Sequence, residues 1–169
     1  MEVRDIINKL EGNKAVFESL FSNVNEEHVH WRPTEGKWSF LEVACHLLDE
    51  ERLDFRSRIS SLFSDPTLPF DPIDPERWVE THFYAEKPYV DVCQNFLSER
   101  SYSIEWLKDV VDEDWGVAYD HPKFGPMSAR FLLDNWLAHD LLHINQWNRM
   151  HYRFLLAQGM DLGYAGKGL

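Results

Sequence analysis

Apolar residues recur at helical spacing in four long stretches of the chain, and the loops between these stretches carry nearly all the prolines and glycines. A spacing close to the helical period predicts amphipathic helices. We place the helices at residues 3–24, 39–64, 88–111 and 128–157. Signals for β-strands are nearly absent. The pattern therefore predicts an all-α protein, a four-helix bundle with long crossover loops that forms a single domain over residues 1–169.

Several predicted helix ends have a sequence signal. Ser39 precedes an apolar run and Glu42 follows three residues later, which is the pattern of a capping box. Pro88 suits the first turn of the third helix, where its missing N–H costs nothing, and Gly159 suits the end of the last helix. Residues 65–78 contain four prolines. We expect no helix there, but a long crossover or a lid.

Charge and composition argue against several classes of protein. The net charge is −12, with 29 acidic and 17 basic residues and no run of Lys or Arg, so we expect no nucleic-acid partner. No run of about 18 apolar residues is present, which predicts that no segment spans a membrane. The charged start of the chain does not resemble a signal peptide. Cys45 and Cys93 stand far apart and outside any CxxC motif, which favours a reduced, cytoplasmic protein.

The last predicted helix carries His139 and His143 one turn apart. On a helical wheel they share a mixed polar face, and Asp140 points away from it toward solvent. The opposite side carries an apolar stripe that could serve the bundle core, a dimer interface or both: Leu133, Leu137, Leu141, Ile144 and Leu155. The second predicted helix has the same design around His46. If the two polar faces look toward each other, three imidazoles converge.

Three neutral imidazoles suit a divalent transition metal, and catalytic sites of this kind keep one further position open. Asp49, Glu50 and Gln146 are placed to orient the imidazoles or to relay a proton. Spacing alone leaves the alternative open that His46 is an ordinary surface or hydrogen-bonded histidine. The aromatic residues that we expect to line a substrate cleft are Trp38, Trp78 and Trp136.

Two segments resemble the signature of the DinB/YfiT-like family of metal-dependent enzymes. They are WRPTEGKWSFLEVACHLLDEE (residues 31–51), in which a Trp-Ser capping element precedes a histidine and acidic residues, and HDLLHINQ (residues 139–146), a His-x-x-x-His pair with a nearby Gln. The Gly-Pro-Met-Ser helix start at 125–128 also fits. The resemblance implies a four-helix bundle, often a homodimer, that binds zinc, nickel or a similar ion such as iron or manganese through His46, His139 and His143.

The resemblance also implies a range of activities. Characterised relatives include S-transferases that use thiols such as bacillithiol or mycothiol, and a thiol-dependent maleylpyruvate isomerase. The leading hypothesis is therefore transfer of a metal-bound low-molecular-weight thiol to a small electrophile. The alternatives are a hydrolase that uses metal-bound hydroxide with Glu50 as general base, and a non-catalytic metal-binding homodimer.

Overall fold

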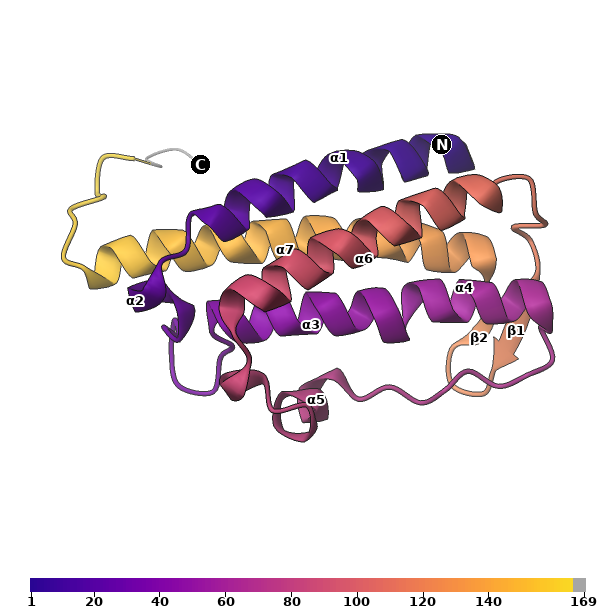
Figure 1. The fold of residues 1–169 in the computed structure, drawn as a ribbon, viewed down its shortest axis with the longest axis horizontal. Helices are drawn as coiled ribbons and strands as arrows, with labels where there is room; N and C mark the ends of the chain where they lie inside the picture. Colours follow the sequence, from indigo (N-terminus) through magenta and orange to yellow (C-terminus); the bar gives the residue numbers. More distant parts are fainter. Residues whose placement is uncertain (166–169) are drawn as a thin grey trace.

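The long helices of the molecule lie side by side along its longest axis (Figure 1). In the computed structural model, which describes residues 1–165, the bundle consists of α1 (Val3–Ser22), α3 (Phe40–Leu53) with α4 (Phe55–Ser64), α6 (Tyr89–Asp109) and α7 (Ala129–Ala157). The connections contain α2 (Glu26–Val29), α5 (Pro75–Thr81), the 3₁₀ helix η1 (Tyr84–Glu86) and the strands β1 (Ala118–His121) and β2 (Gly125–Ser128). The predicted all-α bundle is confirmed. Among the helices described, none is both long and apolar enough to cross a membrane.

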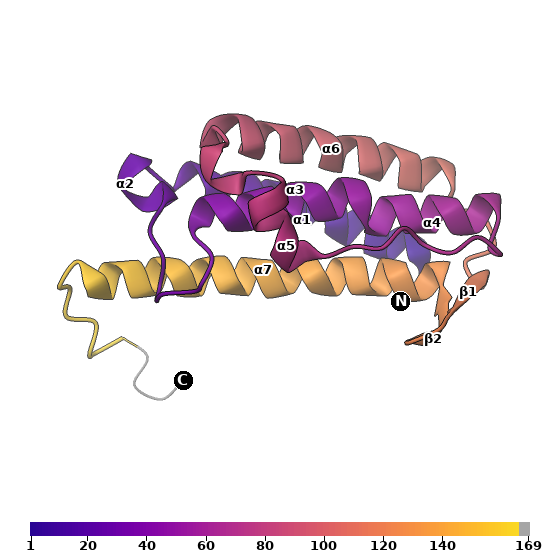
Figure 2. The same ribbon diagram turned by 90° about the horizontal axis from the view of Figure 1, so that it is seen from below.

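The predicted second helix is divided at Asp54, and its two parts α3 and α4 continue nearly in line (Figures 1 and 2). Asp54 has φ −112° and ψ −93°, outside the helical region, and its carboxylate lies 2.9 Å from Nε of Arg58. The apolar positions Phe55, Ile59 and Leu62 stay buried beyond the break. Because the helical periodicity continues across Asp54, the sequence pattern does not reveal the division.

The helix ends follow the predicted chemistry. The Ser39 hydroxyl accepts from the Glu42 backbone N–H at 3.3 Å, and the Glu42 carboxylate accepts from the Ser39 N–H at 2.7 Å, so the capping box is confirmed. Gly159 has φ +80° just beyond α7, a left-handed conformation that favours glycine. Pro88 stands one position earlier than predicted, as the N-cap of α6.

Two connections contain structure that the sequence did not predict. Pro75 begins α5 inside the segment that we expected to lack helix, because proline is tolerated in the first turn and the Asp74 carboxylate accepts from the Arg77 N–H at 3.2 Å. The strands β1 and β2 pair antiparallel, from Ala118 opposite Ser128 to His121 opposite Gly125. Strands this short show too little alternation to be recognised in a sequence.

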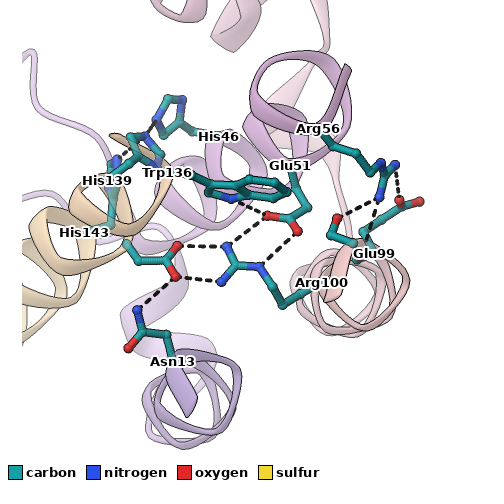
Figure 3. Close-up of polar contacts among 11 residues, drawn as sticks. Asn13, His46, Glu51, Arg56, Glu99, Arg100, Trp136, His139 and His143 are labelled. Atoms are coloured by element: carbon teal, nitrogen blue, oxygen red, sulfur yellow. Dashed lines mark hydrogen bonds and ion pairs between the residues drawn. The ribbon is translucent and has the colours of Figure 1, made fainter. Parts of the chain in front are cut away.

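A polar layer crosses the middle of the bundle between two apolar clusters. Its centre is Arg100 of α6, whose guanidinium binds the Glu51 carboxylate of α3 in a bidentate manner, at 2.9 Å for both contacts. The same guanidinium contacts the Asp140 carboxylate of α7 at 2.6 and 2.8 Å. Asn13 of α1 donates to Asp140 at 3.0 Å, and Trp136 Nε1 donates to Glu51 at 3.2 Å. Figure 3 shows this network, which joins all four long segments.

The orientation predicted for α7 was partly wrong. Asp140 is 0% exposed rather than solvated, and Leu141 of the predicted apolar stripe is 56% exposed and so lies outside the core. The buried side of α7 instead follows Leu133, Trp136, Asp140 and Trp147. From a helical wheel, a charged residue such as Asp140 is expected to face solvent. In the structure the Arg100 guanidinium compensates the charge of the buried Asp140 carboxylate, so Asp140 belongs to the core face of α7.

Candidate metal centre

Three imidazoles from two helices meet beside the polar layer. His46 comes from α3, and His139 and His143 come from adjacent turns of α7. His139 Nε2 lies 3.2 Å from His46 Nε2 and 3.0 Å from His143 Nε2, and one ring nitrogen from each residue lies within 4.8 Å of the other two. Figure 3 shows the three rings gathered at one point. The structure thus brings together the three histidines, a convergence that the helical wheels left conditional on the two polar faces meeting and that the family resemblance implied.

Hydrogen bonding alone does not account for this convergence. An imidazole nitrogen carries either one N–H or one lone pair, so His139 Nε2 can make a linear hydrogen bond to only one of its two neighbours. A shared cation would use the lone pairs of all three nitrogens. Nitrogen ligands of tetrahedral zinc, each at about 2.0–2.1 Å from the ion, stand about 3.3 Å apart. The measured separations of 3.0 and 3.2 Å are close to that value, so the residues fit a metal ion.

Burial keeps the three imidazoles neutral. His46 is 5% exposed, and burial, with His143 nearby, lowers its pKa to about 3. Burial lowers the pKa of His139 to about 2, and its neighbours His143, His46 and Arg100 contribute in the same direction. Burial also lowers the pKa of His143. Metal ligation requires neutral imidazole, so at neutral pH the three side chains are already in the binding form.

The residues predicted to support the histidines lie at different distances from them. Glu50 Oε1 stands 3.8 Å from His46 Nδ1, beyond hydrogen-bonding range, and burial, followed by the effect of Asp54, raises the pKa of Glu50 to about 8. Gln146 lies beside His143 and partly offsets the lowering of its pKa by burial. Within the described part of the chain, neither His46 Nδ1 nor His143 Nδ1 has a hydrogen-bond partner.

Asp49 is occupied elsewhere. Its Oδ2 lies 2.7 Å from His82 Nδ1 and accepts from the Tyr84 hydroxyl at 2.7 Å. Phe83, between these two partners, has φ 52°, a left-handed conformation that is costly for a bulky residue. This conformation allows His82 and Tyr84 to meet the same carboxylate oxygen. The structure therefore places Asp49 in a contact with the 82–84 segment and not against the imidazole cluster.

The three tryptophans predicted at a cleft lie in different environments. Trp38 packs against His46, with ring centroids 4.8 Å apart, and lines a pocket. Trp78 is buried and stacks on His82. Trp136 is 1% exposed, stacks on Phe55 and belongs to the core. The structure thus places only Trp38 of the three at the pocket beside the histidines.

The pocket has a volume of about 790 Å³, and it lies near the imidazole cluster through Trp38, although none of the three histidines lines it. Its walls come from the loop before α3, from α5 and from the C-terminal half of α7. Trp38 contacts the ring of His46, while Leu142 and Gln146 flank His143 in sequence and space. A volume in this range accommodates a small molecule. A bound ion at the histidines would therefore lie at the edge of a space large enough for a substrate.

The basic residues of this pocket were not predicted from the sequence; they are Lys37, Arg149 and Arg153. The sequence does contain a signal for the two arginines. Residues 141–160 contain no Asp or Glu, although the chain has 29 acidic residues in 169. The arginines in this stretch therefore have no acidic neighbour one turn away, and this feature becomes meaningful only when the fold shows which side of α7 they occupy.

The two cysteines are buried in the apolar cluster. Burial raises the pKa of Cys45 from 9.0 to about 12, with Asp49 contributing, and burial likewise raises the pKa of Cys93 to about 12. A thiol with a pKa near 12 is about 0.01% thiolate at pH 8, and the thiolate is the nucleophilic form. Neither cysteine is therefore suited to act as a nucleophile.

We expect that Ellman's reagent at pH 8 will label neither Cys45 nor Cys93 in the native protein, because raised pKa and burial act in the same direction. The same reagent should label both thiols in urea. Rapid, stoichiometric labelling of the folded protein, measured by absorbance, would contradict the assignment of both side chains to the inert core.

A helical bundle with three converging histidines beside a pocket defines a class of candidate metal-binding proteins. A family model described as the DinB superfamily matches residues 9–147, and the chain belongs to this family. A solved structure of YfiT from Bacillus subtilis is similar over 90% of this chain and 87% of that chain, with 16% identity and a TM-score of 0.79. It is described as a probable metal-dependent hydrolase with an unusual four-helix bundle topology. The comparison with curated proteins gives no significant match.

Proposed function

We propose that this protein is a metal-dependent enzyme, and that hydrolysis of a small molecule is its most direct activity. The observation that carries the proposal is the approach of three neutral ring nitrogens, which hydrogen bonding alone does not satisfy. A pocket of about 790 Å³ lies near them. His46, His139 and His143 would hold a divalent ion. The likeness to a protein described as a probable metal-dependent hydrolase supports the same reaction class.

The nucleophile has to come from a bound molecule and not from the chain. Cys45 and Cys93 are buried and protonated, and the described pocket lining contains no serine, threonine or cysteine. A divalent ion would supply a Lewis acid that brings the pKa of a bound water close to about 7. Trp38, which packs on His46, would shield the reacting centre from bulk solvent, and Gln146 lies beside His143.

Imidazole ligands are compatible with several metals. Zinc and nickel are the ions that we favour, with iron and manganese as alternatives, because selectivity among divalent metals depends on geometry and supply as well as on ligand type. Anomalous scattering at the metal edges, measured on crystals grown without chelator, identifies the ion. It would also identify the side chains that bind it.

Thiol transfer is the second candidate function. The inert state of both cysteines is as consistent with thiol transfer as with hydrolysis, because both reactions take their nucleophile from a bound molecule. An S-transferase on this scaffold needs an external low-molecular-weight thiol, since the chain supplies none. The pocket of about 790 Å³ has room for a small thiol and a small electrophile together. In this reaction the thiol sulfur would form a bond to an electrophilic carbon, the bond from that carbon to its leaving group would break with its electron pair, and the thiol proton would pass to the leaving group, so no oxidant is needed.

The experiment that separates these reactions uses the zinc-loaded full-length protein. A panel of esters and amides is assayed alone, and a panel of electrophiles is assayed with and without low-molecular-weight thiols. Turnover without thiol supports hydrolysis, and turnover that requires thiol supports transfer and overturns hydrolysis. If zinc binds stoichiometrically but no added ligand reaches it and no substrate turns over, the protein is a non-catalytic metal-binding protein and the proposal fails.

A homodimer and a cytoplasmic location stay predictions. Leu141, Leu142 and Tyr152 are exposed along α7 and would supply apolar surface for a twofold contact. Sedimentation velocity measures the oligomeric state directly.

A further inference from the structure

The pocket beside the histidines is basic in an acidic protein. Among the described residues, its lining contains Lys37, Arg149 and Arg153 and only one acidic side chain, Glu76. The chain as a whole has a net charge of −12. The local charge of this pocket is therefore opposite to the charge of the molecule, and the pocket is a place where an anion is favoured over the surrounding surface.

The basic side chains of the pocket are exposed and have no carboxylate partner within residues 1–165. Most arginines in residues 1–165 form an ion pair with a carboxylate, such as Arg56 with Glu99 at 2.8 Å. Neither Arg149 nor Arg153 does so within those residues, and neither does Lys37, although carboxylates are plentiful. Their positive charges are therefore available to a ligand.

The placement of the two arginines has no evident benefit for the fold. Arg149 and Arg153 stand four residues apart on α7, and like charges at this spacing destabilise a helix by a few tenths of a kcal/mol. They also lie before the last helical turn, which contains no basic residue, so interaction with the helix dipole contributes little. A binding role explains an arrangement that helix stability does not favour.

The opposite wall of the pocket is held in place by the protein. Arg32 donates to the Lys37 backbone carbonyl at 2.8 Å and to the Glu42 carboxylate at 2.6 Å. This bridge ties the loop that carries Lys37 and Trp38 to the first turn of α3, four residues before His46. Lys37 therefore belongs to a loop fixed relative to the candidate metal centre, which reduces the ordering cost of binding.

We infer that Arg149, Arg153 and Lys37 bind the anionic group of the substrate, a carboxylate or a phosphate, while the reacting bond lies at His46, His139 and His143. The planar guanidinium of arginine suits both anions because it can donate two parallel hydrogen bonds. The reaction in this inference rests on the proposed function, but the anion binding does not. The substrate class is accordingly a small molecule with an acidic group at one end.

The test measures binding by isothermal titration calorimetry on the zinc-loaded full-length protein, with succinate, its neutral diamide and inorganic phosphate as probes. We expect at least one anion to bind and the diamide not to bind. Arg149→Gln and Arg153→Gln should each weaken anion binding by about tenfold or more, because each removes a hydrogen bond to a charged group. Whichever of succinate and phosphate binds with the higher affinity shows whether the anionic group of the substrate is a carboxylate or a phosphate.

Arg130→Gln is the matched control, since it removes the same charge from the first turn of α7, where Arg130 pairs with Asp134. It should leave anion affinity unchanged. Elemental analysis must give equal zinc in all variants. Two results would overturn the inference. If neither anion binds, the pocket is not an anion site. If an anion binds wild type and both pocket variants with equal affinity, it binds only to zinc.

The outcome separates this inference from the proposed function. Anion binding that depends on Arg149 and Arg153, without turnover in any assay, supports the inference and counts against the enzyme. Turnover of neutral and acidic substrates with the same KM, in wild type and in Arg149→Gln, supports the enzyme and overturns the inference. A KM that rises about tenfold in Arg149→Gln for an acidic ester, but not for its neutral analogue, supports both.

Discussion

Replacing Arg100 with methionine is expected to lower the free energy of unfolding by about 3–5 kcal/mol, because it leaves two buried carboxylates without their counter-ion. Arg100 is 1% exposed and contacts both Glu51 and Asp140. Burial disfavours its charge, but Asp140 and Glu51 more than offset burial and raise the pKa of the guanidinium. Urea unfolding followed by circular dichroism measures the change, with attention to whether the slope of the transition is preserved.

Two comparisons show whether unpaired charge causes the loss. Arg4→Met breaks the exposed pair with Asp112, and such a surface pair contributes only about 0–1 kcal/mol. The triple variant Arg100→Met, Glu51→Leu, Asp140→Leu replaces the whole network with apolar side chains and should recover much of the lost stability. If the triple variant is as unstable as Arg100→Met, the loss comes from packing and not from the two carboxylates.

The polar layer has a structural consequence for the histidines. Asp140 lies directly after His139 in α7, and its contact with Arg100 fixes how α7 is rotated against α3. With Asp140 turned into the core, His139 and His143 are carried to the side of α7 that faces His46. A purely apolar seam would allow α7 to shift or rotate more easily, since apolar contacts have no direction, whereas a bidentate ion pair does.

Only part of the histidine convergence could be predicted from local geometry. The approach of His46 to His139, 93 positions later, was expected only from the family resemblance, whereas the spacing of His139 and His143 places them one turn apart on any helix. The main helices and the capping box at Ser39 were predicted for the same reason. These features depend on periodicity and on contacts within one turn, which a single sequence contains.

The features that the sequence did not predict depend on partners that are distant along the chain. Asp140 looks like a solvated residue until Arg100, 40 positions away, is placed beside it. The pocket charge from Arg149 becomes visible only when α7, α5 and the loop before α3 are assembled around one space. Phe83, with its left-handed φ, is similarly unpredictable, because the contacts of its neighbours with Asp49 hold it in place.

Replacing any one of His46, His139 and His143 with alanine is expected to weaken zinc binding by more than about 100-fold, the upper range for losing a residue that merely supports a ligand. The reason is the shared geometry of the three ring nitrogens, all within 4.8 Å of one another. Competition with a chromophoric chelator measures the affinity, and elemental analysis after dialysis measures the content. His151→Ala is the matched control, because this half-buried histidine on α7 packs on Phe40, outside the cluster.

Stability measurements distinguish a metal ligand from a histidine that only fills space. Zinc at about 1,000 times its dissociation constant should stabilise the wild-type protein by about 4 kcal/mol through mass action. Binding weakened by more than about 100-fold leaves at most about 1.4 kcal/mol of this increment at the same zinc concentration. His139→Ala should therefore lose most of the increment, whatever its stability without metal, and His151→Ala should retain it. Because the comparison is made within each variant, with and without zinc, the cost of the cavity left by alanine cancels. Full zinc content and an undiminished increment in all three ligand variants would show that the imidazoles of α3 and α7 meet for packing alone.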